Sequence, residues 1–412
     1  MTSEQLEAIG PALTDFLRPF ERFFDNREGV AHLRNYARGL LSDLERKTAE
    51  PLALSAGVPP RNVQQFLKAC MWDDRGLLDA VQQHVRAAVV ATPDDGLGTV
   101  AVFDETSAVK KGDKTPGVQR QYLGCVGKVE NGIVTVHLAA VRNGAKALLD
   151  GELFLPKSWA ADRSRCDAAD IPTDMRHRPK WRIAFELLGR ADGNGWRFDW
   201  ATFDAGYGGV PNFLKLLDVC GQQYVGEVPK TFSVRVADDA TKIGAAAVFD
   251  RPGVKAIKAK AFALTQQTGP AAVWQAKRVD VCLGDELRPT HQLIKARNRQ
   301  TGEVKYFIAR SNRRVGLRLL LRVGFTRWHV EHLFRVAKDE IGLTHFEGRS
   351  YVSLKRHQAL CLTVMAFVAL HTMRLRGEKP GGDLGAGLPG AATARPAVSE
   401  PAPPHGRDAV PA

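Results

Sequence analysis

The sequence predicts an α/β protein: a mixed sheet with flanking helices, an all-helical N-terminal domain, and a β-rich insertion before the last helical segment. Three observations carry this prediction. Apolar residues recur at three- and four-residue spacing up to about residue 92, strand-like and helical runs then alternate, and only short β runs follow Pro229. A chain of 412 residues is long enough for two or three domains with cores of their own.

Residues 1–92 form the predicted helical domain, which contains a candidate DNA-binding motif. Helical periodicity is clearest in LTDFLRPFERFF and LRNYARGLLSDLERK. The stretch LALSAGVPPRNVQQFL predicts two short helices joined by a turn at Gly57. This pair is either a helix-turn-helix or, on pattern alone the better reading, a plain helical hairpin.

Residues 93–228 make up the first part of the predicted core. TVAVFDETS indicates a strand that ends at Asp104, and YLGCVGKVENGIVTVHLAAV indicates two strands joined by a hairpin at 130–132. KWRIAFELLGR is an amphipathic helix, WATFD a strand, VPNFLKLLDVC a helix and QYVGEV a strand. The order is three antiparallel-type strands, then helix, strand, helix, strand.

The rest of the chain divides into three parts. Residues 229–302 form the β-rich insertion, in which we predict no helix, and residues 303–375 complete the core with a strand and a helical stretch from Arg313. After Arg376 the composition changes, because Gly, Pro and Ala supply 22 of the remaining residues. Such a segment cannot bury a core, so 376–412 is predicted to be a disordered tail.

Charge and cysteine content narrow the class of partner and compartment. The chain has 58 Lys and Arg against 45 Asp and Glu, a net charge of +13, and a pI near 9.6. This excess favours a polyanionic partner, nucleic acid above all. The six cysteines are dispersed, which is typical of a reducing compartment and argues against a zinc cluster. The N-terminus lacks a signal-peptide pattern and the longest apolar run, Ala359–Leu370, predicts a buried helix, so we expect a cytoplasmic protein without a membrane partner.

Two aspartates share one local context. Asp104 and Asp204 each follow an apolar strand and precede a turn. Groups at the ends of neighbouring strands converge on a common crevice, where two carboxylates can bind one divalent ion. Oxygen donors favour Mg²⁺ or Mn²⁺ over zinc. For either residue alone, a cap of the following turn is the commoner role.

A third carboxylate lies on the predicted helix around residue 331. Val330, Phe334, Ala337 and Ile341 fall on one helical stripe that can face a core. Glu331 falls beside that stripe with Arg327 and Lys338, so it can meet the sheet edge. The alternative is an exposed ion pair of Glu331 with an arginine one turn away.

The pattern R-x3-E-x6-K, formed by Arg327, Glu331 and Lys338, resembles the third catalytic region of DDE-type insertion-sequence transposases. RWHVEHLFRVAKDEIGLTHFEGRS is similar to the seven-oh-one branch of the insertion-sequence four superfamily. VFDETSAVKKG and FDAGYG resemble that family's two aspartate blocks, and the resemblance runs from about residue 18 to 372. One position departs from the pattern, since the tyrosine of the family's motif would fall at Gly324.

The resemblance implies an RNase H-like sheet with a β-rich insertion between the second and third acids. It implies that Asp104, Asp204 and Glu331 are catalytic and bind two Mg²⁺ ions per site, which Mn²⁺ can replace. Two such ions activate a nucleophile and stabilise the leaving oxygen of a phosphodiester. The implied activity is cutting DNA at the element's terminal inverted repeats and joining the ends to target DNA. The implied form is a homodimer or larger oligomer on double-stranded DNA, at the bacterial nucleoid.

Basic side chains near these acids are expected to bind DNA phosphates. Lys110 and Lys111 follow the first aspartate, with Lys114 close behind. A solvated basic face is an equally good reading of these clusters. Two other functions stay open: a catalytically silent transposase-derived DNA-binding protein, or another RNase H-like nuclease. The remaining predicted phosphate ligands are Arg314, Arg318, Arg322, Arg327 and Lys338.

Overall fold

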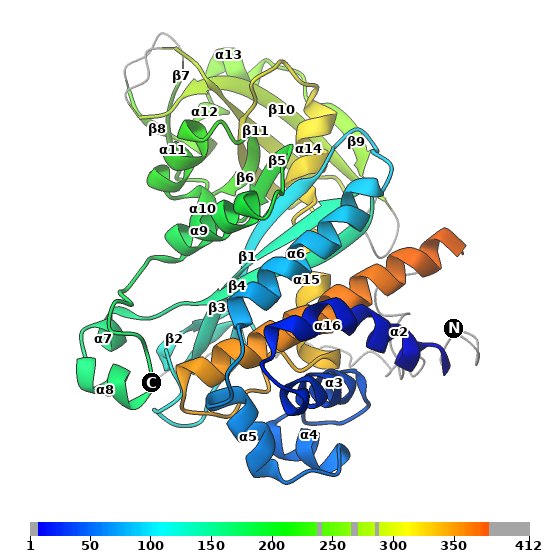
Figure 1. Cartoon of the computed structure of the whole chain (residues 1–412). Helices are drawn as coiled ribbons and strands as arrows, with labels where there is room; N and C mark the ends of the chain where they lie inside the picture. The colour runs from blue at the N-terminus through cyan, green and yellow to red at the C-terminus, as the bar shows by residue number, and fades with distance from the viewer. Residues whose placement is uncertain (1–6, 237–240, 265–270, 285–287, 379–412) are drawn as a thin grey trace, which may run out of the picture.

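The computed structural model describes residues 7–236, 241–264, 271–284 and 288–378, and it is built around a large mixed sheet with helices on its faces (Figure 1). The predicted α/β class is thereby confirmed. The predicted tail, residues 376–412, lies outside the described residues from 379 onward.

The N-terminal helices pack together with the long helix α16 (Tyr351–Glu378). Helices α3, α5 and α6 contact α16, which in turn contacts strand β4. The buried residues of these elements and of the sheet form one continuous hydrophobic cluster. The elements are α2 (Ile9–Leu17), the 3-10 turn η1 (Arg18–Phe23), α3 (Arg27–Leu41), α4 (Ala49–Ser55), α5 (Pro60–Lys68) and α6 (Asp74–Ala91).

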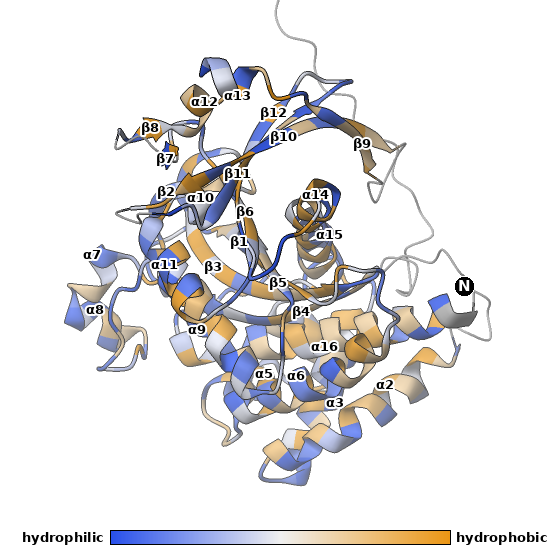
Figure 2. Cartoon of the chain, turned by 90° about the horizontal axis from the view of Figure 1, so that it is seen from above, coloured by the Kyte–Doolittle hydropathy of each residue, from blue (hydrophilic) through white to orange (hydrophobic). Residues whose placement is uncertain are grey.

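Helix α16 is apolar on nearly all sides. It is the one described helix that is long and apolar enough to cross a membrane, yet 78% of its apolar window is buried inside the protein. Figure 2 shows the apolar residues running along α16 and the strands beside it. The helix predicted over Ala359–Leu370 is therefore confirmed as a buried one.

The sheet has twelve strands among the described residues. Its order is β2-β3-β1-β5-β6-β12-β11-β10-β7-β8, with β4 also paired to β3 and β9 to β10. Strands β1 and β3 are antiparallel, whereas β1, β5 and β6 run parallel to one another. The strands are β1 (Val100–Val109), β2 (Gln119–Leu123), β3 (Lys128–Arg142), β4 (Ala145–Leu153), β5 (Trp200–Phe203), β6 (Tyr224–Val228), β7 (Ser233–Val236), β8 (Ile243–Gly244), β9 (Lys260–Leu264), β10 (Ala272–Cys282), β11 (His291–Asn298) and β12 (Val304–Arg310).

Two expectations about the first strands are wrong. Strand β1 does not end at Asp104 but continues to Val109, because β3 pairs with it along its whole length. The hairpin predicted at 130–132 is the interior of β3, where a Cβ at Gly132 would lie 2.3 Å from the carbonyl oxygen of Ala108. Gly132 thus permits close packing rather than a turn. The predicted hairpin instead turns at residues 124–127, between β2 and β3. A second tight turn, at Asn143 and Gly144 with φ angles of 43° and 81°, joins β3 to β4.

Residues 229–302 are rich in β structure and continue the main sheet. Strand β12 pairs antiparallel with β6, and β11 and β10 follow outward. The segment also contains two single-turn helices, α12 (Ala245–Val248) and α13 (Pro252–Lys255), where no helix was predicted. Each is only four residues long, too short to produce a helical period in the sequence.

The predicted helical stretch from Arg313 is broken into segments. Residues 314–316 are not helical, and the first helix is α14 (Leu317–Phe325). Helix α15 (Trp328–Arg335) follows and continues into a π-helical turn, η2 (Val336–Glu340). Gly342, with a φ of 82°, then starts a loop that ends at α16. The predicted apolar stripe is confirmed, since Val330, Phe334, Ala337 and Ile341 are all buried.

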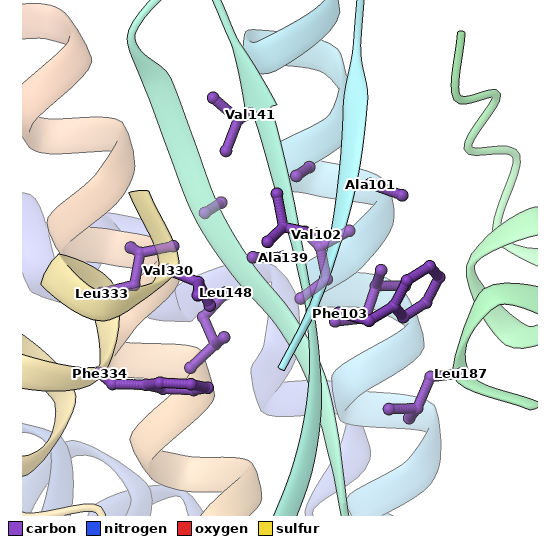
Figure 3. Packing of buried hydrophobic residues seen from close by; sticks show 14 of the residues in the cluster. Ala101, Val102, Phe103, Ala139, Val141, Leu148, Leu187, Val330, Leu333 and Phe334 are labelled. Carbon is purple, nitrogen blue, oxygen red and sulfur yellow. The ribbon is translucent and has the colours of Figure 1, made fainter. Parts of the chain in front are cut away.

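The two faces of the sheet carry different helices. Figure 3 shows Phe103 of β1 beside Leu187 on one face, with Val330, Leu333 and Phe334 of α15 on the other. Side chains alternate along a strand, so Asp104 points to the face opposite Phe103, the face of α15. Helices α9 (Lys180–Gly193) and α11 (Pro211–Val219) pack on the face of Phe103, and α10 (Ala205–Gly208) lies between β5 and α11. Helices α7 (Lys157–Ala160) and α8 (Arg163–Ala168) instead form a second hydrophobic cluster with Ala108 and the start of α16.

Candidate active site

Asp104 and Asp204 lie on neighbouring parallel strands. Strands β1 and β5 pair at Val102 and Thr202, so each aspartate stands two residues further along. Asp204 ends β5 and caps the short helix α10, accepting hydrogen bonds from the backbone N–H groups of Gly206 (2.9 Å) and Tyr207 (3.3 Å). The cap is the role expected for one aspartate alone, and it also fixes Asp204 beside Asp104.

The environment of Asp104 disfavours its charge. Only 13% of its side chain is exposed. The pKa of Asp104 is raised to about 7, mainly by burial, with Arg327 acting in the opposite direction and the negative charge of Asp204 adding to the rise. A carboxyl group with a pKa near neutrality next to a second carboxylate is typical of a functional site.

Glu331 reaches this pair through Arg327. One guanidinium nitrogen of Arg327 donates to Asp104 Oδ2 and another to Glu331 Oε1, and each donor–acceptor distance is 2.8 Å. Arg327 is 16% exposed at its side chain, whereas Glu331 is 60% exposed. The third acid is therefore held at the edge of the site by a single arginine. This contact also includes the one-turn ion pair that was the alternative reading of Glu331.

The donor set suits a hard divalent cation, because all three groups supply carboxylate oxygens. Without a bound ion, the three carboxylates are too far apart to share one: in the described ranges, no group of three or more His, Cys, Asp or Glu side chains is placed to hold a metal ion. Arg327 occupies the space between Asp104 and Glu331. Asp104 and Asp204 are thus brought together directly, and Glu331 through a cation of the chain itself.

The predicted phosphate ligands differ in exposure and in whether their side chains already bind other groups of the protein. Lys110 donates to the backbone oxygens of Thr344 (3.0 Å) and Phe346 (2.5 Å), and Arg322 pairs with Asp95 at 2.6 Å. Arg314 precedes α14, so it does not share the predicted helical stripe with Arg318 and Arg322. The side chains of Lys111, Arg314 and Arg318 are exposed, and Lys338 lies half-buried in the π-helical turn.

Gly324, where the family's tyrosine would fall, is packed closely against the sheet. A Cβ at this position would lie 3.1 Å from the ring of Phe307 and 3.3 Å from Val225, so a side chain here would require these neighbours to move. The next residue, Phe325, packs against Trp274 and Trp328 at ring-centroid distances of 4.6 and 4.5 Å. Trp328 therefore packs in an aromatic cluster.

Two features of the site escaped the sequence. Lys180 of α9 forms an ion pair of 2.6 Å with Glu105, the neighbour of Asp104. Trp274 of β10 joins the insertion to α14 and α15. No spacing in the sequence relates these residues, because each contact joins segments more than 50 residues apart.

Comparison with known proteins defines the class of this chain. The family model of the DDE superfamily endonucleases matches residues 19–288, more than half of the chain. The chain therefore belongs to the DDE superfamily endonucleases. The matched range includes Asp104 and Asp204 and ends before Glu331.

A curated relative is the probable transposase for insertion sequence element IS701 of Microchaete diplosiphon, 30% identical over 200 residues. The alignment covers 48% of this chain and 48% of the relative, so the chain spans about half the length of the relative it matches. The predicted resemblance to a DDE-type insertion-sequence transposase is confirmed by these two matches.

A cryo-EM structure of the piggyBac transposase synaptic complex with hairpin DNA also aligns, over 91% of this chain and 78% of that one. The sequence identity is 12% and the TM-score 0.43, and no conclusion is drawn from a similarity of this size.

Proposed function

We propose that the protein is a metal-dependent DNA endonuclease and strand transferase that mobilises an insertion sequence. The observation that carries this proposal is the adjacency of Asp104 and Asp204 on parallel strands, with Glu331 linked to Asp104 by Arg327. Membership of the DDE superfamily endonucleases supports it. The substrate would be double-stranded DNA at the element's terminal repeats, and the protein would act at the nucleoid as a dimer or larger oligomer.

The strand order supports an RNase H-like core. Strands β4, β3 and β1 form an antiparallel meander, and β5 and β6 then add in parallel on the other side of β1. Strands β7 to β11 would be the insertion before the third acid, and β12 would return the chain to the core. Residues 1–92 would contact the terminal repeats, and residues 93–228 and 303–375 would be the two parts of the catalytic core.

Each side chain has a role in this proposal. Asp104, Asp204 and Glu331 would hold two Mg²⁺ or Mn²⁺ ions. Such ions would activate a water or a 3′-hydroxyl and stabilise the charge that develops on the scissile phosphate. Without bound metal, Arg327 forms an ion pair with both Asp104 and Glu331. Arg314, Arg318, Arg322, Lys111 and Lys338 would bind the DNA backbone, which would make binding strongly salt-dependent.

The test is strand cleavage of the native flanking DNA in Mg²⁺ or Mn²⁺ by wild type, Glu331→Gln and Asp339→Asn. Asp339 is an exposed acid of the same helical segment and serves as the matched control. We expect nicks at defined element ends, lost by a factor of at least about 100 in Glu331→Gln and kept in Asp339→Asn, with DNA binding retained in all three.

Three outcomes would redirect the assignment. Full cleavage by Glu331→Gln would remove Glu331 from the catalytic set. No metal-dependent cut by any of the proteins, with end binding retained, would favour a silent DNA-binding descendant. Cleavage without dependence on element ends would favour another nuclease of the same fold.

A further inference from the structure

A basic pocket of about 740 Å³ lies away from the three acids, at the far end of β1. Three remote segments line it: residues 46–48 after α3, residues 109–115 after β1, and residues 344–349 before α16. The last segment follows the helix that carries Glu331. The pocket contains two acids, Asp113 and Glu347, against five basic residues: Arg46, Lys110, Lys111, Lys114 and Arg349.

Two lysines tie the three segments together. The backbone N–H of Lys47 donates to His345 Nδ1 at 3.1 Å, and Lys47 Nζ donates to the backbone oxygens of Leu40, at 2.6 Å, and Glu340. Lys110 does the same for residues 344 and 346. Burial lowers the pKa of both lysines to about 8. Their ammonium groups are hydrogen-bonded to these carbonyls, so Lys110 stabilises the wall of the pocket.

The outer cations are available to a ligand. Lys111, Lys114 and Arg349 are exposed, and in the described part of the chain their side chains form no ion pair or hydrogen bond. Arg46 is paired with Glu347. Burial lowers the pKa of His345, and so do the charges of Lys47, Lys110 and Arg46. The pocket is therefore a positive site at which an anion gains energy.

We propose that this pocket binds backbone phosphates of the DNA duplex beyond the cleavage site. The proposal rests on the proposed function. The cations come from three segments around an open recess, which suits a row of phosphates on a duplex better than one small anion. Five residues of strand separate Asp104 from Val109, roughly 17 Å. For a duplex that runs along β1, at about 3.4 Å per base pair, the bound phosphates would lie roughly five base pairs from the scissile one.

The test compares wild type with the double variant K111A/K114A and a charge-matched control, K258A/K260A. Lys258 and Lys260 are exposed and lie at or beside β9, at the other end of the molecule (Figure 1). Affinity for a native-end duplex is measured by fluorescence anisotropy from 50 to 200 mM salt. Phosphate-ethylation interference on the same duplex then locates the contacts.

Loss of two phosphate contacts should reduce the salt slope of log K by about 1.8, so that wild type loses about 12-fold more affinity than the variant across this range. Ethylation roughly five base pairs from the cut should weaken wild type and the control but not K111A/K114A. An unchanged slope and interference pattern in a folded K111A/K114A would overturn the pocket, whether or not the protein cuts DNA. The expected slope change without any metal-dependent cleavage would keep the pocket and reject the nuclease.

Discussion

The two halves of the candidate site are held by different means. Asp104 and Asp204 stand on paired strands, with their backbones fixed by the ladder between β1 and β5 and by the cap of α10. Glu331 stands on a helix, 60% exposed, and one arginine joins it to the rest. The sheet half is set when the protein folds, whereas the helix half can adjust when a cation or DNA competes with Arg327.

The largest effect should come from the sheet half. Phe203 precedes Asp204, is 1% exposed, and packs on Phe213 at a centroid distance of 5.0 Å. Phe203→Ala should lower the free energy of unfolding by about 3–5 kcal/mol, because it removes a buried ring and leaves a cavity beside β5. Urea unfolding measures this loss. Leu54→Ala, at a side chain that is 64% exposed, is the control and should change stability by less than about 0.5 kcal/mol. A loss below 1 kcal/mol for Phe203→Ala would mean that this half is not rigid.

A smaller, pH-dependent effect should come from Asp104. Its pKa rises from an ordinary 3.8 to about 7 on folding, mainly through burial. Between these values the folded state holds a proton that the unfolded state has released, so stability falls as pH rises through this window. Asp104→Asn should remove that slope and be more stable than wild type at pH 7.5 relative to pH 4.5, by up to a few kcal/mol.

Urea unfolding of wild type and Asp104→Asn at pH 4.5, 5.5, 6.5 and 7.5 measures the difference. Asp113→Asn, at an exposed acid, is the control and should follow wild type at every pH. If the difference between wild type and Asp104→Asn does not change with pH, the Arg327 pair keeps Asp104 ionised in the folded protein, and the sheet half carries its charge before any cation arrives.

The sequence predicted the sheet half better than the helix half. Asp104 and Asp204 were located by apolar runs that precede them, and such runs survive an error in strand length: β1 continues five residues past Asp104, yet the aspartate still meets Asp204. The hairpin at 130–132 was misplaced because a glycine in a turn and a glycine under a crossing backbone look alike in one dimension. The pair Asn143 and Gly144 does form a turn, between β3 and β4.

The helix half depended on long-range contacts that no local pattern encodes. The spacing of Arg327 and Glu331 predicted their pairing, but the contact of Arg327 with Asp104 joins residues 223 positions apart. The π-helical turn at Lys338 was also not predicted, because no residue pattern distinguishes a single π-helical turn from a continuing α-helix. Arg322 proved to be paired with Asp95 from the start of the core.

The smallest predicted effect addresses the link between the halves. Arg327→Met keeps the length of the side chain and removes the cation between Asp104 and Glu331. Since Arg327 and a divalent ion compete for the same oxygens, we expect Mn²⁺ to bind roughly tenfold more tightly, equivalent to about 1.4 kcal/mol. Isothermal titration without DNA measures this affinity, and Arg335→Met, at an exposed arginine of the same helix, is the control. Weaker binding in Arg327→Met would show that the arginine instead positions Glu331 for the ion, which would make the helix half as preorganised as the sheet.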